Sequence, residues 1–267
     1  HNSMTSNWLV PVRLTVSGIL LLCFALLRGQ NIFAVWKNRQ DIFDILLFGL
    51  LGSALCQYGY YTSIQYSNVA LATVLAYMSP AMILVYTVIK EKRLPHLYET
   101  ICVLLVLAGA FTCTTHLSPK SLAVTPQALF WGLISAASFV VYTMQPRRLL
   151  QKFDLVMIIG WGMLIGGIAL ILLFQPWTIT VVVNSTLFIN MAVVILFGTV
   201  FSFCFYQAGV TIVGSITGSI LSSVEPVASM VISVLFLNVA LTALDFAGFL
   251  LILASIPIIA LGDKNHK

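Results

Sequence analysis

An acidic residue lies in the middle of an apolar segment in the second half of the sequence. Glu225 is the only charged residue in the run 215–237 and stands about ten residues from either end. A carboxylate at the centre of a membrane costs about 2.5–3.5 kcal/mol on insertion scales, so it faces a cavity, pairs with a cation or carries a proton. Glu225 is therefore a candidate proton-exchanging or cation-binding group. The alternative is a structural carboxyl group that is hydrogen-bonded to a neighbouring helix.

Two prolines interrupt apolar segments at related positions. Pro80 and Pro226 are 146 residues apart, and each removes a backbone N–H group and loosens the helical turn before it. Carbonyl groups freed at membrane depth are tolerated where they line a cavity or find partners. Paired interruptions in two halves of a chain indicate a binding region. A packing kink is the alternative interpretation of each proline.

Tyrosine, amide and hydroxyl side chains supply further candidate binding groups. Gln57, Tyr60 and Tyr61 share one helical face through i, i+3 and i+4 spacing. The other candidates of this kind are Tyr77, Ser79, Tyr206, Gln207 and Ser222. Such groups would line an amphipathic pocket, where they offer stacking surfaces and a few hydrogen bonds. The alternatives are an aromatic belt at the membrane surface and hydrogen bonds between helices.

The elements that must position these residues are membrane-spanning helices. The chain is 60% hydrophobic and only 8% charged, whereas a soluble domain carries about 25% charged residues. A spanning helix needs roughly 20 mostly apolar residues, and long Leu-, Ala- and Gly-rich runs favour helices over barrel strands. We therefore predict an all-α integral membrane protein. Nine spans are expected, at 8–27, 43–65, 69–89, 98–116, 127–145, 155–174, 189–211, 215–237 and 243–262.

Basic residues concentrate on one side of the predicted membrane. Eleven Lys and Arg residues fall on one side, Lys120 falls alone on the other, and Arg13 lies within the first span. Cytoplasmic loops carry an excess of Lys and Arg, so we expect a multi-pass plasma-membrane protein with a cytoplasmic C-terminus. Arg13 is near the external end of its helix, and its side chain is long enough to reach the membrane surface. Anion binding is the alternative role for Arg13.

An internal repeat relates the two halves of the sequence. An ungapped shift of 146 residues superimposes three pairs of less common residues, Gly52 on Gly198, Tyr60 on Tyr206 and Pro80 on Pro226. The first half then holds four spans and the second half five, so the partner of 127–145 would precede residue 1. We expect a ten-helix protein whose first helix is missing here, and a true start at Met4 is the alternative. Five helices per repeat require the two halves to be inverted, as is typical of secondary transporters.

The repeated pattern resembles that of a known family. An alanine-rich helix with a central proline, a charged loop and a Gly/Ala/Leu-rich helix occupy 69–111, and a second copy at 214–262 contains Glu225-Pro226. This pattern is similar to the drug/metabolite transporter superfamily, specifically its EamA-type ten-helix permeases. The resemblance implies a 5+5 inverted-repeat transporter bundle, with a first EamA repeat at 1–120 and a second at 121–267. Glu91 matches the family's acidic loop residue, which Leu237-Asn238 replace in the second copy.

These observations together predict a secondary active transporter. We expect an exporter of small organic metabolites, such as amino acids or drug-like compounds, that works by alternating access with Glu225 as a candidate proton-coupling site. A small-molecule substrate and the lipid bilayer are the expected partners, a monomer suffices although a dimer is open, and nucleic-acid binding is not expected. The sequence has no Walker, HExxH, GxSxG or paired-cysteine metal motif, so no enzyme activity, metal or cofactor is expected. A facilitated-diffusion carrier and a non-transporting scaffold or receptor are the alternatives.

Overall fold

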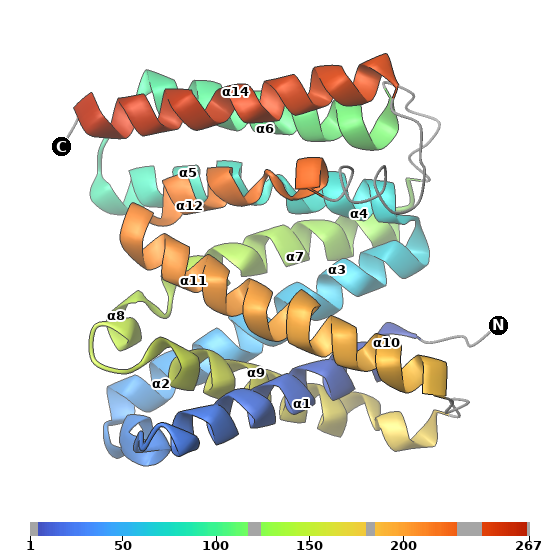
Figure 1. Ribbon diagram of the computed structural model, residues 1–267, viewed down its shortest axis with the longest axis vertical. Helices are drawn as coiled ribbons and strands as arrows, with labels where there is room; N and C mark the ends of the chain where they lie inside the picture. The colour runs from blue at the N-terminus through green and yellow to red at the C-terminus, as the bar shows by residue number, and fades with distance from the viewer. Residues whose placement is uncertain (1–4, 117–123, 180–184, 229–241, 266–267) are drawn as a thin grey trace.

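The computed structural model describes residues 5–116, 124–179, 185–228 and 242–265, and every regular element in these ranges is a helix (Figure 1). Within them, eight stretches are long and apolar enough to cross a membrane. They are Ser6–Leu27, Arg39–Tyr66, Val69–Glu91, Leu97–Thr115, Pro126–Leu150, Leu155–Phe174, Leu187–Val213 and Ala243–Gly262. The all-α membrane fold expected from the sequence is thus confirmed. The remaining expected span, 215–237, begins with a helix at Ser215–Ser222, but its C-terminal part lies outside the described residues.

Several spans are built from more than one helical element. The single-helix spans are α1 (Ser6–Leu27), α6 (Leu97–Thr115), α9 (Leu155–Phe174) and α14 (Ala243–Asn265). The second span combines α2 (Arg39–Leu47), η2 (Phe48–Ala54) and α3 (Leu55–Tyr66), and the third combines α4 (Val69–Ala76) and α5 (Ser79–Glu91). In the second half, one composite span combines α7 (Pro126–Met144) and α8 (Arg147–Leu150). Another combines α10 (Ser185–Ile195), η5 (Leu196–Phe201) and α11 (Ser202–Val213). The span that begins at Ser215 starts with α12 (Ser215–Ser222), and short 3₁₀ turns occupy η1 (Ile32–Lys37) and η4 (Pro176–Thr178).

Several helices begin where the local sequence supplies a side-chain cap. The Asn68 side chain accepts a hydrogen bond from the backbone N–H of Leu71 at 2.9 Å and starts α4. Thr125 caps α7 in the same way, and Asp154 caps α9. Each cap satisfies a backbone donor that the first turn of a helix leaves unpaired.

Corresponding helices of the two predicted repeats cross as antiparallel pairs. A Cβ atom added at Gly18 of α1 would lie 2.5 Å from the backbone N of Leu164, its counterpart in α9 under the 146-residue shift. In the second pair, a Cβ atom at Gly109 of α6 would lie 2.7 Å from the carbonyl oxygen of Gly248 in α14. Such small residues let backbones approach closely, which is how helices associate in membranes.

The glycine-rich face of α9 also packs closely against its neighbours. An added Cβ atom would lie 3.1 Å from the Leu21 side chain at Gly160, and 2.7 Å from the carbonyl oxygen of Gly49 at Gly166. At Gly162 an added Cβ atom would collide with the Phe48 ring. These close contacts fix how α1, η2 and α9 are rotated relative to one another.

Both halves carry the same helical interruptions at positions related by the shift of 146 residues. η2 and η5 are π-helical segments, and each contains one glycine of the Gly52–Gly198 pair. The α4–α5 break falls at Tyr77-Met78, and the break after α12 falls at Ser223-Val224. Tyr77 and Ser223 have nearly identical backbone angles, with φ/ψ of −72°/−1° and −70°/0°. Short π segments and broken helices are common at functional sites, because they free backbone groups for binding.

The two ends of the bundle differ in charge. Figure 1 shows α8, the α5–α6 connection and the C-terminus at one end (left), and the N-terminus and the α3–α4 connection at the other (right). The first end, called the basic end below, carries Arg93, Arg147, Arg148 and Lys152. The second is called the opposite end.

Candidate substrate cavity

A polar cavity lies among the helical interruptions of the two halves. Its volume is about 540 Å³, within the range of small-molecule binding sites. Its wall combines α1, α3, α4, α5 and α6 of the first half with α7, η5, α11, α12 and α14 of the second. Val69 in the first turn of α4 and Thr114 near the end of α6 line it, so the cavity extends towards the opposite end of the bundle.

Most of the candidate binding residues lie on the wall of this cavity. They are Gln57, Tyr60, Tyr61, Tyr77, Ser79, Pro80, Ser222, Glu225 and Pro226. The structure therefore brings together residues that the sequence separates by up to about 170 positions. Whether these residues bind a substrate or an ion remains a prediction.

The two other candidates, Tyr206 and Gln207, lie outside the wall of this cavity. The Tyr206 hydroxyl shares a hydrogen bond with the hydroxyl of Thr143 at 2.9 Å, and its ring packs against Phe139. The Gln207 side chain is fully buried and donates to the carbonyl oxygen of Tyr142 at 3.0 Å. Neither residue lines the cavity, because this face of α11 packs against α7. Their repeat-related positions therefore do not give them the environment of Tyr60 and Tyr61.

Glu225 is an exposed carboxylate on the cavity wall. It follows the break at Ser223-Val224 and precedes Pro226, and under the 146-residue shift it corresponds to Ser79. It forms no ion pair with any residue that the structure describes. A carboxylate with this exposure can exchange a proton with the cavity or bind a cationic group.

Arg13 is the second charged residue on the cavity wall, and the structure turns it inward. Its residue exposure is only 3%, so it does not extend to the membrane surface as its position in α1 allowed. Its guanidinium donates one hydrogen bond to the Tyr61 hydroxyl at 2.8 Å and another to the Gln57 carboxamide oxygen. It also lies over the Tyr61 ring, 4.7 Å from the ring centroid.

The rest of the wall combines aromatic rings with hydroxyl-bearing and small side chains. Tyr60 and Tyr61 pack edge to face with centroids 5.6 Å apart, and the Tyr60 hydroxyl is 3.3 Å from the hydroxyl of Thr73. Phe139, Phe203 and Phe249 complete the apolar part of the wall. The sequence did not single out these phenylalanines, because in a chain with 17 of them nothing local marks the ones that face a cavity.

An ion-pair network at the basic end connects α2 to α8. The Arg148 guanidinium donates to Asp44 at 2.6 Å and to Asp41 at 2.7 Å. Lys152 adds an ion pair with Asp41 at 3.1 Å, and the Gln145 amide donates to Asp44 at 3.0 Å. Because α2 lies in the first predicted repeat and α8 in the second, this network ties the two repeats together.

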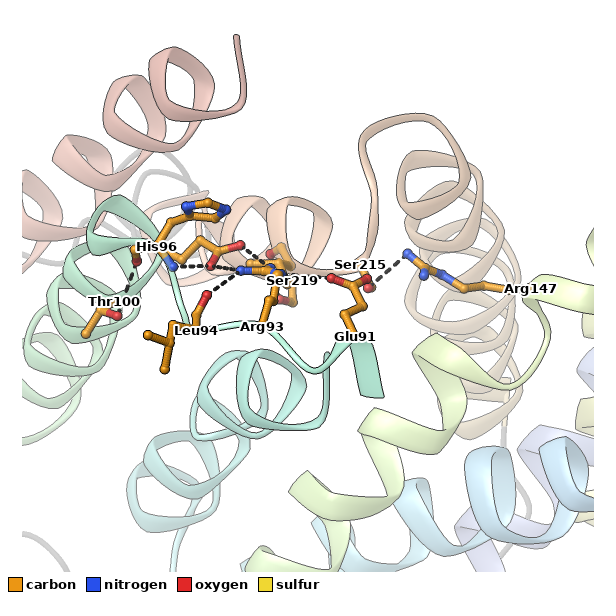
Figure 2. Close-up of polar contacts among 10 residues, drawn as sticks. Glu91, Arg93, Leu94, His96, Thr100, Arg147, Ser215 and Ser219 are labelled. Atoms are coloured by element: carbon orange, nitrogen blue, oxygen red, sulfur yellow. Dashed lines mark hydrogen bonds and ion pairs between the residues drawn. The ribbon is translucent and has the colours of Figure 1, made fainter. Parts of the chain in front are cut away.

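A second polar cluster at the basic end surrounds the α5–α6 connection (Figure 2). Arg93 contacts Glu99 at 2.6 Å and Glu91 at 2.8 Å, and the hydrogen bond that it donates to Glu99 is the main cause that raises the pKa of the Arg93 guanidinium above its ordinary value. Nearby, Arg147 donates to the hydroxyl of Ser215 at 2.9 Å and so holds the start of α12. Polar contacts therefore hold the α5–α6 connection and the start of α12 in place at the basic end.

At the opposite end, the acidic residue that corresponds to Glu99 pairs with a histidine. Glu99 accepts from the backbone N–H of His96, and Asp245, its counterpart under the 146-residue shift, accepts from that of Thr242. The partner of Asp245 is His116, whose Nε2 lies 2.8 Å from the carboxylate. The first turns of α6 and α14 are thus capped in the same way. The partner of the acidic residue differs, because it is Arg93 for Glu99 and His116 for Asp245.

A second hollow, between α5 and α7, is larger but has few polar groups on its wall. Its volume is about 640 Å³, and Met78, Met82 and Val85 are typical of its mainly apolar wall. It contains no charged side chain. Recognition of a polar substrate needs a few placed polar groups, so the cavity with Glu225 and Arg13 is the candidate site.

Comparison with known proteins identifies the family. The model of the EamA-like transporter family matches residues 1–115 and 126–261. An uncharacterized inner membrane transporter of Salmonella typhimurium, YicL, is 33% identical over 266 residues, which cover 100% of this chain and 89% of YicL. A protein known from a crystal structure shares the fold with a TM-score of 0.82 at 16% identity, over 99% of this chain and 90% of the other. The chain therefore belongs to the EamA-like transporter family, as its repeated pattern predicted, and is a multi-pass membrane transporter.

Proposed function

We propose that this transporter exports small organic metabolites by alternating access, and that Glu225 couples export to proton entry. The observation that carries the proposal is the position of Glu225, an exposed carboxylate on the wall of a cavity that both halves of the chain build. A carboxylate there can hold either a proton or a cationic group of the substrate. Exchange of one for the other would couple the two movements in opposite directions.

The closed basic end and the position of the cavity support alternating access. The Arg148 network and the Arg147–Ser215 contact link different spans at the basic end, whereas the cavity extends towards the opposite end. The paired breaks at Tyr77-Met78 and Ser223-Val224 give each half a point at which its helix can bend. A rearrangement that opens the basic end and closes the opposite one would move the site from one side of the membrane to the other.

The proposed orientation places the basic end in the cytoplasm. Lys and Arg are in excess in cytoplasmic loops, and the last helix, α14, ends at the basic end (Figure 1). The name of YicL as an inner membrane transporter supports a location in the cell membrane. We propose a cytoplasmic C-terminus and a monomer as the working unit, since one chain supplies both walls of the cavity. In this orientation the cavity would face the outside.

Transport in proteoliposomes tests the proposal directly. The protein would be reconstituted, a pH gradient imposed in either direction, and flux measured for pools of amino acids and of aromatic metabolites. Glu225→Gln removes the charge on the cavity wall and keeps the shape of the side chain. Glu91→Gln is the matched control, because Glu91 is half exposed at the basic end and lies outside the cavity.

The possible results separate the parts of the proposal. Gradient-driven flux that is lost in Glu225→Gln and kept in Glu91→Gln would support proton-coupled transport through Glu225. Equal gradient-driven flux in all three proteins would refute the role of Glu225. Flux that ignores the gradient would indicate facilitated diffusion, and no flux for any pool would favour a scaffold or receptor.

A further inference from the structure

Two charged side chains of opposite sign line the same cavity without pairing with each other. Arg13 comes from α1 and Glu225 from the segment after α12, and no ion pair joins either of them to a residue that the structure describes. We propose that the cavity binds an organic zwitterion, with its carboxylate on Arg13 and its ammonium group on Glu225. This inference rests on the proposed function, since it names the class of substrate that the cavity carries.

Arg13 is held in place by groups that leave its charge uncompensated. The Tyr61 hydroxyl, the Gln57 carboxamide and the Tyr61 ring orient the guanidinium, but all of them are neutral. The Nε atom of Arg13 is buried and has no hydrogen-bond partner. The guanidinium is therefore positioned by neutral groups alone, and one of its N–H donors is unsatisfied.

A buried guanidinium in this state is suited to binding an anion. Arginine does not lose its proton in proteins, so burial cannot be relieved by neutralisation. Buried charges are normally paired, because the loss of hydration is otherwise uncompensated. By contrast, the other deeply buried charged side chains of the described residues, Asp41, Asp44, Glu99 and Asp245, all have ionic partners. The counter-ion of Arg13 must then come from a bound molecule.

The charge on the wall favours a carboxylate over a more highly charged anion. Arg13 is the one cationic residue among the side chains that line the cavity. A single planar guanidinium matches the two oxygens of a carboxylate, with which it forms parallel hydrogen bonds. A phosphate group carries more charge than one guanidinium balances. The nearby carboxylate of Glu225 would make this imbalance worse.

Glu225 supplies the complementary pole of the site. It is exposed on the cavity wall, whereas Arg13 is buried in the same wall. Because the two poles do not contact each other, a molecule that carries both charges can compensate both at once. An amine alone would leave Arg13 uncompensated, and an acid alone would leave Glu225 uncompensated.

The remaining wall residues indicate what kind of side chain the ligand carries beside its charged groups. Tyr60, Tyr77, Phe139, Phe203 and Phe249 provide apolar and aromatic surface around the two charged groups. A volume of about 540 Å³ accommodates a small molecule and no polymer. An α-amino acid with an apolar or aromatic side chain meets both the charge and the size requirements.

Three related compounds test the assignment of the two poles. L-Phenylalanine carries both charges, L-phenylalaninamide lacks the carboxylate, and 3-phenylpropionate lacks the amine. Flux in proteoliposomes and binding in detergent by isothermal titration calorimetry would be measured for each compound. The proteins would be the wild type, Arg13→Gln, Glu225→Gln and Arg28→Gln, the last a matched control because Arg28 is an exposed arginine on the C-cap of the same helix.

The wild type should bind L-phenylalanine at least about tenfold more tightly than either analogue. Arg13→Gln should weaken binding of L-phenylalanine by about 10- to 100-fold, as expected for a lost charge-assisted pair, and change that of the amide by less than about threefold. Glu225→Gln should weaken binding of the two compounds that carry an amine, L-phenylalanine and L-phenylalaninamide. It should leave binding of 3-phenylpropionate unchanged. Arg28→Gln should match the wild type.

Other results would overturn the inference and leave the proposed function to be judged separately. Equal wild-type binding of all three compounds, or an Arg13→Gln variant that weakens all three alike, would make Arg13 a structural residue. Absence of L-phenylalanine binding would also refute the zwitterion site, even if other compounds in the pools are transported. Conversely, selective binding without any transport would keep the site and refute export.

Discussion

Loss of the Arg148 network should open the basic end of the bundle. Arg148→Gln removes the guanidinium that donates to Asp41 at 2.7 Å and to Asp44 at 2.6 Å. Both carboxylates keep one partner, since Lys152 still pairs with Asp41 and Gln145 still donates to Asp44. Neither acid is left buried and alone, so the variant should fold.

The size of the effect follows from the burial of the partners. The side chains of Asp41 and Asp44 are 5% and 13% exposed, whereas that of Arg148 is 33% exposed. An exposed ion pair contributes about 0–1 kcal/mol and a broken buried pair costs about 3–5 kcal/mol, so about 2 kcal/mol is expected here. Such a loss changes an equilibrium about 30-fold, which would turn a ratio of about 1:99 between open and closed basic ends into about 1:3.

Distances between spin labels would measure this population. Labels at Gln40 and Gln151, two exposed positions on either side of the network, would be introduced into a cysteine-free background and measured by double electron–electron resonance. Arg148→Gln should add a longer distance that is rare in the parent protein. Lys37→Gln is the control, because Lys37 is an exposed cation for which the structure shows no ion pair. Identical distance distributions in Arg148→Gln and in the control would refute the role of the network in closing this end.

Two further pairs of variants test the packing and the caps by thermal unfolding in detergent. Gly18→Ala places a Cβ atom 2.5 Å from backbone atoms of Leu164 and should destabilise the protein by about 1–3 kcal/mol, whereas Gly209→Ala meets no atom within 4 Å and should be neutral or stabilising. Equal melting temperatures for these two would contradict the close crossing of α1 and α9. Glu99→Gln, which loses a buried ion pair, should cost about 2 kcal/mol, and Glu91→Gln, at 51% exposure, less than about 1 kcal/mol. A Glu91 variant as unstable as the Glu99 variant would show that burial does not set the strength of these pairs.

The course of the chain through the membrane was predictable, because it depends on local features. Spans are recognised by the length of apolar runs, and the structure has helices at eight of the nine expected places, with the last part of 215–237 outside the described residues. The breaks near Pro80 and Pro226 were also predictable, since a proline acts on its own turn. The division into repeats at 1–120 and 121–267, their inverted orientation and the proposed first helix of ten remain predictions.

The candidate site was predictable only in part. Glu225 was found because a charge at membrane depth is costly wherever it occurs, and it does line the cavity. Tyr206 and Gln207 do not line this cavity, because a repeat in the sequence does not guarantee equivalent surroundings, and here α7 covers the face that carries them. Conversely, Arg13 could have extended to the membrane surface, and only the structure shows it turned towards Gln57 and Tyr61.

By itself, the sequence determined that this protein spans a membrane and where its described helices run, and it marked Glu225 as an unusual residue. These conclusions follow from hydrophobicity and spacing, which act within one helix. The tertiary structure alone decided which face of each helix borders the cavity. That choice depends on how the helices are rotated against one another, and contacts such as Gly18 with Leu164 fix the rotation between residues about 146 positions apart. For this reason, the sequence alone could not show that Arg13 and Glu225 line the same cavity.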